Sequence, residues 1–330
     1  MKILITGGAG YIGSHVVKEF LDRRYRVTVY DNLSSGLKEN LFNEAEFIQG
    51  DILDYHTLTE AMKKSSNAPF DAIVHLAALK AAGESMEKPE IYSSNNICGT
   101  INILNAASFS GIKKIVFSSS ASVYGQPEYL PVDEQHKLNP QNFYGFTKME
   151  IERLLFWYEK LKGIRYACLR YFNAAGYDKN GSIKGLEQNP LNLIPLIMET
   201  ACGIRQEIQI YGNDYNTPDG TCIRDYVHVS DLAAAHAAAL DYISSGDKSL
   251  TVNLGSEKGV SVLEMIEAVR RIIGKPIPAK ITGRRAGDPA ILTASSSLAQ
   301  KLLGWETKHS DIETIIKTSW EAYKGLVGSE

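Results

Sequence analysis

Tyr144 and Lys148 form a YxxxK pair, and these two residue types at this spacing could carry out proton transfer. A separation of four residues places both side chains on one face of a helix. A free tyrosine titrates at about 10, which is too high for a good base at neutral pH. A nearby positive charge favours the phenolate and lowers that pKa, so the pair predicts a general base acting on an alcohol.

Ser120 gives this pair its context. It lies upstream in the stretch SSSASVYG, at the end of a predicted strand. A hydroxyl there can orient the alcohol whose proton the tyrosine removes. A Tyr and a Lys one turn apart also occur by chance on many amphipathic helices, but Ser120, Tyr144 and Lys148 together predict a site that oxidises or reduces an alcohol.

A glycine-rich loop near the start of the chain predicts a dinucleotide site. The stretch GGAGYIG follows the first predicted strand and opens the first predicted helix. Glycines there permit a tight turn and let the pyrophosphate approach the backbone, where the helix N-terminal amides face the anion. An ordinary glycine-rich turn is the alternative. The residues predicted to hold the dinucleotide here are Gly7, Gly10, Tyr11, Ile12 and Gly13.

Asp31 ends the second predicted strand and indicates which dinucleotide is bound. A carboxylate there accepts from both hydroxyls of the adenosine ribose and repels a 2′-phosphate, which favours NAD over NADP. Asn32 beside it is also expected to bind the cofactor, and capping of the next turn by Asp31 together with Asn32 is the competing interpretation. Asp51 and Ile52 fit the adenine edge and an apolar wall, with an exposed loop acid as the alternative. The small residues after the fourth strand would let backbone lie close to the cofactor: Leu76, Ala77 and Ala78.

Short β-branched runs alternate with longer helical patterns through the first half of the chain. This rhythm predicts an α/β fold of the Rossmann type, a doubly wound parallel sheet with helices on both faces. The predicted strands are Lys2–Thr6, Arg26–Tyr30, Glu46–Gln49, Ala72–His75, Lys114–Ser118 and Arg165–Arg170, and the predicted helices are Ile12–Arg23, Pro89–Ser110 and Tyr144–Leu161.

After about Asn173 the pattern changes to loops rich in Gly, Asn and Asp. We expect an NAD-binding domain at 1–172 and, mainly at 173–330, a smaller C-terminal α/β lobe that binds substrate. A later strand and helix around 221–260 return to the first domain, the strand at Leu250–Leu254. The helices predicted in the lobe are Leu191–Cys202, Ser230–Ser244, Ser261–Ile273 and Ser310–Tyr323.

Composition excludes several classes of protein. The 330 residues are 44% hydrophobic, enough to bury a large core, and carry a net charge of −3. Without a basic block, we expect neither nucleic acid nor an anionic membrane as a partner. The start lacks signal-peptide features and no stretch is apolar enough to span a bilayer, so we expect a cytoplasmic protein. The scattered Cys98, Cys168, Cys202 and Cys222 fit reduced thiols, and no metal site is predicted.

Several motifs together resemble the UDP-glucose (UDP-galactose) 4-epimerase family of the extended short-chain dehydrogenases. They are GGAGYIG, HLAALKAAGES, SSSASVYG, YGFTK, RYFNAAG and the long block YGNDYNTPDGTCIRDYVHVSDLAAAH. The resemblance runs from residue 2 to about residue 305. The glycine loop and YxxxK occur throughout the superfamily, whereas the block Tyr211–His236 is far more selective.

This resemblance implies interconversion of UDP-glucose and UDP-galactose by transient oxidation at C4, with NAD tightly bound and regenerated each cycle. Tyr144 would remove the proton of the 4-hydroxyl, Ser120 would hydrogen-bond the same oxygen, and Lys148 would bind the nicotinamide ribose. It also implies a homodimer formed through the helices at Pro89–Ser110 and Tyr144–Leu161. Further cofactor contacts implied are Lys80, Asn95, Ser118 and Tyr171, and Lys80 is also expected near the substrate.

The resemblance further implies a site for the UDP-sugar. Arg224 and Arg285 would bind the diphosphate, and Asp288 would bind a ribose hydroxyl. Each of these residues has an ordinary alternative as a surface cation, loop cap or core side chain. The remaining implied contacts are Phe172, Asn173, Asn192 and Leu193 around UDP and hexose, with Ile210 and Tyr211 at uracil.

Leu292 bears on specificity, because family members selective for non-acetylated hexoses often carry a bulky Tyr at the matching position. The smaller side chain predicts some activity on UDP-N-acetylglucosamine and UDP-N-acetylgalactosamine.

Dehydratases of nucleotide sugars are a competing class, but they need an Asp-Glu pair after the catalytic hydroxyl, where this chain has Ala121 and Ser122. An epimerase of UDP-uronates or UDP-pentoses uses the same catalytic residues and stays open. A non-catalytic NAD sensor of this fold is the other alternative, although such a protein would not need the catalytic hydroxyl of Tyr144.

Overall fold

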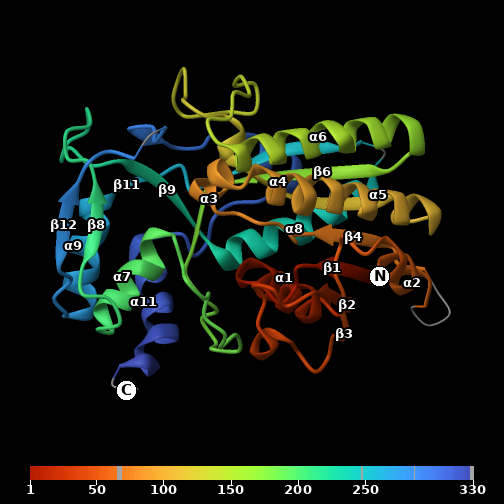
Figure 1. Ribbon diagram of the computed structural model, residues 1–330, viewed down its shortest axis with the longest axis horizontal. Helices are drawn as coiled ribbons and strands as arrows, with labels where there is room; N and C mark the ends of the chain where they lie inside the picture. Colours follow the sequence, from red (N-terminus) through yellow and green to blue (C-terminus); the bar gives the residue numbers. More distant parts are fainter. Residues whose placement is uncertain (65–68, 247, 286, 328–330) are drawn as a thin grey trace.

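A parallel seven-stranded sheet lies at the centre of the computed structural model, which describes residues 1–64, 69–246, 248–285 and 287–327 (Figure 1). The strand order is β10-β6-β5-β4-β1-β2-β3. The order reverses between β1 and β4, the kind of switch point at which doubly wound sheets bind ligands. The fold class predicted from sequence is confirmed. The strands are β1 (Lys2–Thr6), β2 (Arg26–Asp31), β3 (Glu46–Gln49), β4 (Ala72–His75), β5 (Lys114–Ser120), β6 (Arg165–Tyr171) and β10 (Leu250–Leu254).

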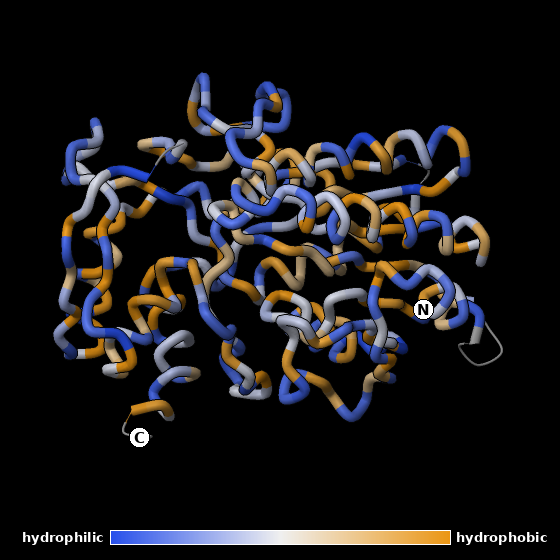
Figure 2. Tube along the Cα trace, viewed as in Figure 1, coloured by the Kyte–Doolittle hydropathy of each residue, from blue (hydrophilic) through white to orange (hydrophobic). Residues whose placement is uncertain are grey.

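Helices cover both faces of this sheet, because its strands are apolar on both sides. In β1, Ile3 and Ile5 belong to the core beneath α1 and α8, whereas Leu4 belongs to the core on the opposite face. Figure 2 shows hydrophobic residues concentrated along these central strands. One face carries α1 (Tyr11–Asp22) and α8 (Val229–Ser245), and the other carries α2 (Tyr55–Lys64), α5 (Gly99–Phe109) and α6 (Phe143–Lys162).

The single helix predicted at Pro89–Ser110 is broken by a π-helical turn. The segment comprises α4 (Pro89–Tyr92), a π turn at Ser93–Cys98 and then α5. Within the turn, the Asn96 side chain accepts a hydrogen bond from Leu79 N at 2.9 Å and donates to Leu79 O at 3.0 Å. Such turns are frequent at functional sites. Here the turn ties the loop after β4, and with it α3 (Ala82–Glu87), to the helical layer.

The rest of the chain builds a second group of elements beside the carboxyl ends of the parallel strands (Figure 1). Its core packs α7, α9 and α11 around Ile208 and Ile210. Ser261 and Glu264 form a capping box at the start of α9. The strands are β7 (Asn173–Ala175), β8 (Ile208–Tyr211), β9 (Ile223–His228), β11 (Gly259–Ser261), β12 (Ala279–Thr282) and β13 (Ile291–Leu292), and the helices are α7 (Leu193–Ala201), α9 (Val262–Ile273) and α11 (Ile312–Tyr323). Helix α10 (Ser297–Leu303) instead packs against the core of the main sheet.

The chain crosses between these two groups of elements more than once. After building β8 and β9 it returns to the main sheet, where β10 pairs with β6 as the edge strand. The strand predicted at Leu250–Leu254 is therefore confirmed, while the domain bounds at 172 and 173 stay a prediction.

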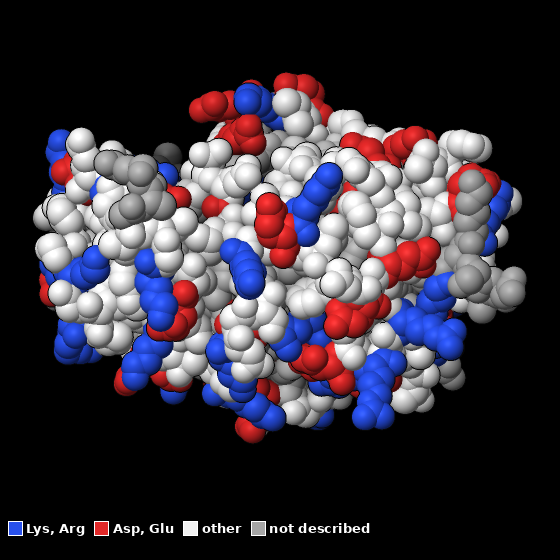
Figure 3. Space-filling view, turned by 90° about the horizontal axis from the view of Figure 1, so that it is seen from below, with Lys and Arg blue, Asp and Glu red and all other residues white. Residues whose placement is uncertain are grey.

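The surface view in Figure 3 shows acidic and basic side chains interspersed over that face. Across the described part of the chain, every helix is too short or too polar to cross a membrane.

Candidate active site

Tyr144 is presented by the first turn of α6, and three contacts fix that turn. Asn142 caps the helix by accepting a hydrogen bond from Gly145 N at 2.8 Å. The N–H of Tyr144 donates to Ser85 Oγ in α3 at 3.0 Å. Asn96 Nδ2 donates to Thr147 Oγ1 at 3.1 Å, which joins the π turn to the same helix. The predictions omitted Ser85, Asn96 and Thr147 as site residues, because each acts through tertiary contacts.

Lys148 lies beneath Tyr144, one turn further along α6, and is buried. Its Nζ donates to Ser118 O at 2.7 Å and lies 5.7 Å from the centroid of the Tyr144 ring. Burial lowers the pKa of Lys148 to about 7, while the Glu152 carboxylate acts in the opposite direction.

Ser120 completes the group at the end of β5. Its backbone is extended and its Oγ accepts a hydrogen bond from Ser122 N at 3.1 Å. Its hydroxyl also lies close enough to the phenol of Tyr144 to oppose part of the rise in the pKa of that phenol. The structure thus brings together Ser120, Tyr144 and Lys148, the three residues predicted to carry out the chemistry.

The sequence-based expectation attributes a lowered pKa of Tyr144 to two positive charges, the Lys148 ammonium and the nicotinamide ring, and the residues of the protein alone do not supply that effect. Burial raises the pKa of Tyr144 to about 12, and the hydroxyl of Ser120 only partly opposes this. Lys148 does not lower the pKa of Tyr144 because burial disfavours the charge on both side chains. A phenolate at neutral pH therefore requires a positive charge beyond those of the protein.

The glycine loop connects β1 to α1 with little free space. Gly7 adopts φ of 77°, and a Cβ placed on it would lie 2.6 Å from Ala77 N. A Cβ on Gly13 would lie 2.0 Å from Gly7 O. Gly10 precedes α1 without a side-chain cap, so the first amides of the helix are available to an anion. This cradle of main-chain atoms fits a dinucleotide pyrophosphate.

Replacing Gly7 by alanine is expected to weaken dinucleotide binding at least about tenfold. The positive φ alone disfavours a Cβ by about 1–2 kcal/mol, and the contact with Ala77 adds to this. Titration of the purified variant with NAD measures the loss. Gly83→Ala is the matched control, since a Cβ there meets nothing within 4 Å. Equal affinities for both variants would contradict the assignment of the loop.

The other predicted cofactor residues at β1 and β2 lie around this loop. The Asp31 carboxylate accepts from Ala9 N at 3.0 Å and from Leu33 N at 2.8 Å, so it is fixed at the end of β2. Asn32 Nδ2 donates to Asp51 Oδ2 at 2.9 Å. The Tyr11 hydroxyl donates to Gly176 O at 2.5 Å, which turns this side chain toward the C-terminal elements.

The predicted residues of the apolar wall and the β4 loop lie just beyond the ends of β3 and β4. Ile52 is buried against Gly99 at the start of α5. Leu76 N and Ala77 N both donate to Thr6 O at 3.0 Å, which holds the start of the β4 loop against β1. Ala78 follows them, and Ile12 packs partly buried against the main core.

Lys80, Asn95 and Tyr171 have partners within the protein. Lys80 forms an ion pair with Glu187 at 2.5 Å, across to the segment before α7. Asn95 Nδ2 donates to Asn96 Oδ1 at 2.9 Å. The hydroxyl of Tyr171 hydrogen-bonds His236 Nε2 at 2.6 Å, which holds it beside Ser118. Their roles toward a cofactor stay predictions.

The predicted diphosphate group comes from the C-terminal elements. Arg224 on β9 lies 3.6 Å from the Asp288 carboxylate. The guanidinium of Arg285 stacks 4.3 Å from the centroid of the Tyr211 ring. Leu292 on β13 pairs with Arg224 in register. Two arginines that meet a partly exposed tyrosine and a carboxylate can bind a nucleoside diphosphate.

The remaining predicted substrate residues divide between surface and core. Asn173 Nδ2 donates to Asp225 O at 3.0 Å, next to the buried ring of Phe172. Asn192 precedes α7, and Leu193 begins it while packing against the C-terminal core. The side chain of Ile210 is buried in that core, which leaves only its main chain for a ligand.

Comparison with known proteins finds similarity to a single enzyme family over nearly the whole chain. The model of a family described as the NAD dependent epimerase/dehydratase family matches residues 3–255. A UDP-glucose 4-epimerase of Lacticaseibacillus casei is 46% identical, covering 97% of this chain and 96% of that protein. The structure of UDP-glucose 4-epimerase from Brucella ovis in complex with NAD is 42% identical, covers 98% of both chains and has a TM-score of 0.94. That from Bifidobacterium longum in complex with NAD+ and UDP is 36% identical, with 98% of both chains covered and a TM-score of 0.92.

Proposed function

The chain belongs to the NAD dependent epimerase/dehydratase family, and on this basis we propose that it interconverts UDP-glucose and UDP-galactose by inverting C4 of the hexose with tightly bound NAD. The observation that carries the proposal is the meeting of Ser120 and Tyr144 above the buried Lys148, at the carboxyl ends of β5 and β6. Similarity to UDP-glucose 4-epimerases over nearly the whole chain supports the choice of substrate.

The residues of the chain would bind, orient and exchange a proton. NAD, when bound, supplies the oxidant for C4 and the positive charge that lowers the pKa of the tyrosine. The main-chain cradle from Gly7 to Gly13 and the carboxylate of Asp31 would hold it. Tyr144 takes the proton of the 4-hydroxyl and later returns it, and Ser120 hydrogen-bonds the same oxygen throughout.

Inversion requires a firmly held nucleotide and a loosely held hexose. Arg224 and Arg285 would hold the diphosphate, since guanidinium groups bind phosphate oxygens in a bidentate manner. Asp288, which lies beside Arg224, would accept a hydrogen bond from a ribose hydroxyl. Asn173 and Asn192 would flank the sugar, where few contacts let the ring present either face to the site.

The test is to purify the protein and assay it without added cofactor. We expect bound NAD in the purified protein and conversion of UDP-galactose to UDP-glucose, and the reverse. UDP-glucuronate and UDP-xylose serve as comparison substrates. Turnover of these two without turnover of the hexoses would contradict the proposed substrate, and bound NAD without any turnover would indicate a sensor.

Leu292 supports an additional proposal that N-acetylated UDP-hexoses are also accepted. It lies on β13 beside the cluster that contains Phe172 and Ala294, so a larger side chain there would project into the same space. Leu292→Tyr is expected to lower kcat/KM for UDP-N-acetylglucosamine by roughly 10–200-fold, the range for steric discrimination in a pocket, with little change for UDP-glucose. Absence of acetylated-sugar turnover by the unmodified protein would contradict this proposal.

We also infer a homodimer in the cytoplasm that acts in galactose metabolism. Large apolar side chains are exposed along the outer side of α5 and α6, among them Phe109, Trp157 and Leu161. A second copy would cover them, because monomers rarely leave such patches in water. Light scattering of the eluted protein is expected to give twice the mass of one chain.

The proposed cytoplasmic location rests on the cysteines, which are free thiols and fit a reducing compartment.

A further inference from the structure

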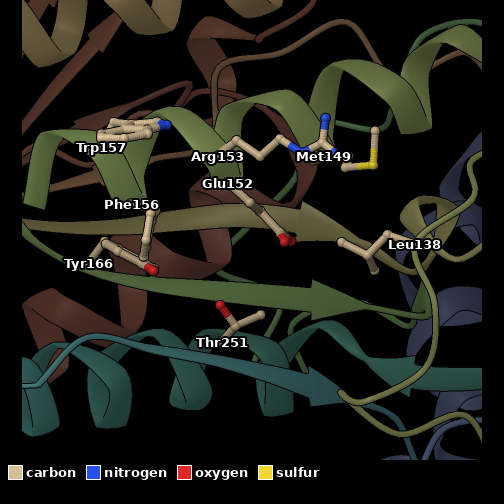
Figure 4. A pocket seen from close by; sticks show the side chains of 8 residues that line it. All are labelled: Leu138, Met149, Glu152, Arg153, Phe156, Trp157, Tyr166 and Thr251. Carbon is tan, nitrogen blue, oxygen red and sulfur yellow. The ribbon is translucent and has the colours of Figure 1, made fainter. Parts of the chain in front are cut away.

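A buried ion pair joins α6 to β6 directly behind the proposed catalytic residues. Glu152, one helical turn beyond Lys148, is 9% exposed, and Arg170, beside Tyr171, is 5% exposed. Arg170 Nη2 and Nε donate to Glu152 Oε2 and Oε1 at 2.6 and 3.0 Å. Figure 4 shows Glu152 directed from α6 toward the strands, in the wall of a cavity of about 350 Å³. Buried ion pairs add little net stability compared with apolar residues, so stability alone does not account for this pair.

Glu152 also binds the strand that carries the catalytic serine. Ser119 Oγ donates to Glu152 Oε1 at 2.5 Å. Ser119 immediately precedes Ser120 in β5, and successive side chains of a strand point to opposite faces. Fixing Ser119 to α6 therefore fixes the direction of Ser120 relative to Tyr144, which lies on the same helix as Glu152.

The network extends from Arg170 to the loop that follows Ser120. Arg170 Nη1 donates to the Tyr124 hydroxyl at 2.8 Å, and that hydroxyl donates to Asn253 Oδ1 on β10 at 2.6 Å. Every one of these side chains is buried. Removing one member would leave a desolvated polar group without its partner, so the chain of bonds holds the end of β5 rigidly.

Glu152 provides the negative charge that acts on Lys148. The groups facing Lys148 are Tyr144 and Glu152 on α6, His75 on β4 and Cys168 on β6. Burial lowers the pKa of Lys148 to about 7, and the carboxylate of Glu152 raises it in opposition. Burial lowers the pKa of His75 to about 3, so this ring adds no competing positive charge at neutral pH. Without the carboxylate, Lys148 would lose its proton at a lower pH.

We propose that Glu152 is a positioning residue for C4 epimerisation: its carboxylate anchors Ser119, and through it Ser120, and keeps the side chain of Lys148 charged beneath Tyr144. This inference rests on the proposed function, since it assigns Glu152 a part in that reaction.

The test compares the pH dependence of kcat in the holoenzyme and in Glu152→Gln. In this proposal the ammonium of Lys148 holds the nicotinamide ribose beneath Tyr144, so kcat falls as the pH rises through the pKa of Lys148, and loss of the carboxylate moves that decline to lower pH by about one unit. We expect kcat to fall about tenfold at alkaline pH and less than about threefold at mildly acidic pH, with UDP affinity unchanged. Glu150→Gln is the matched control on the outer side of α6, where Glu150 pairs with Arg153, and it should keep the original profile.

Two further variants separate anchoring from charge. Ser119→Ala removes the hydrogen bond without changing any charge, so we expect a lower kcat by the same factor at every pH. Glu152→Asp keeps the charge but withdraws it from Lys148, and a smaller shift of the profile is expected. If Glu152→Gln does not fold, the pH dependence of kcat in Glu152→Asp tests the proposal instead. A lower melting temperature with an unchanged pH profile in the variant used would overturn the proposal.

Nitrogen NMR of the lysine side chains gives a readout that is independent of turnover. The pKa of Lys148 should be lower in Glu152→Gln than in the unmodified protein, and equal values would overturn the proposal. If the unmodified protein shows no epimerase activity while the Lys148 pKa still shifts, the proposed function fails but the electrostatic role of Glu152 stands.

Discussion

Replacing Tyr144 by phenylalanine is expected to lower kcat by about 10²–10⁴-fold, the usual contribution of a positioned general base. The substitution removes only the hydroxyl oxygen, which in this protein interacts with Ser120. The ring and the contacts of the backbone with Ser85 and Asn142 stay in place, so UDP binding and the melting temperature should change little. Steady-state kinetics together with UDP titration separate these effects.

Tyr158→Phe is the matched control for this variant. Tyr158 lies on the same helix, and its hydroxyl donates to Asn105 at 2.7 Å on the exposed side. This control should keep full turnover. Wild-type kcat in Tyr144→Phe would contradict the assignment of the base, because another group would then have to accept the proton.

The second large effect is a loss of stability in mild acid, caused by histidines that are buried in neutral form. Burial lowers the pKa of His15 and His236 to about 4 and that of His75 and His228 to about 3. In the unfolded chain these side chains titrate at about 6.5. Below that pH the unfolded state binds more protons than the folded state, so the free energy of unfolding decreases until the pH reaches the folded pKa values.

The size of this loss of stability follows from the number of protons that the four histidines take up on unfolding. Each histidine contributes about 1.4 kcal/mol per pH unit, so together the four lower the free energy of unfolding by roughly 5 kcal/mol per unit around pH 5. Urea unfolding at a series of pH values measures the slope. His236→Gln should reduce the slope by about one proton, whereas His56→Gln, at an exposed position, should leave it unchanged. Equal slopes for both variants would contradict the prediction.

The parallel sheet and the glycine loop could be predicted because their signals are local. Strands buried on both faces are runs of β-branched residues, and the loop GGAGYIG must stand between β1 and α1 to act on a pyrophosphate. For the same reason Ser120 and Tyr144 could be identified before any contact was known. Ser120 and Tyr144 lie near each other because β5 and β6 are adjacent in the sheet and α6, which carries Tyr144, connects them.

Features that depend on distant partners could not be predicted. Strands β8 and β12 are short, and β12 is mostly exposed, so no hydrophobic pattern in either segment predicts that the two strands pair. The bond between Glu152 and Arg170 joins two elements whose contact only the tertiary fold decides. The extent to which Lys148 affects the pKa of Tyr144 could not be predicted for a related reason. The YxxxK spacing shows that an ammonium is near, but not how deeply both groups are buried.

The return of β10 to the edge of the main sheet has a consequence for synthesis on the ribosome. Until Leu250–Leu254 has emerged, β6 has unpaired main-chain groups along one side, and the hydroxyl of Tyr124 lacks its acceptor on Asn253. A nascent chain that stops near residue 172 therefore exposes a sheet edge on which other chains can add. Completion of the main sheet must wait for translation of β7, β8 and β9 with the helices between them, so chaperones have most to protect during that interval.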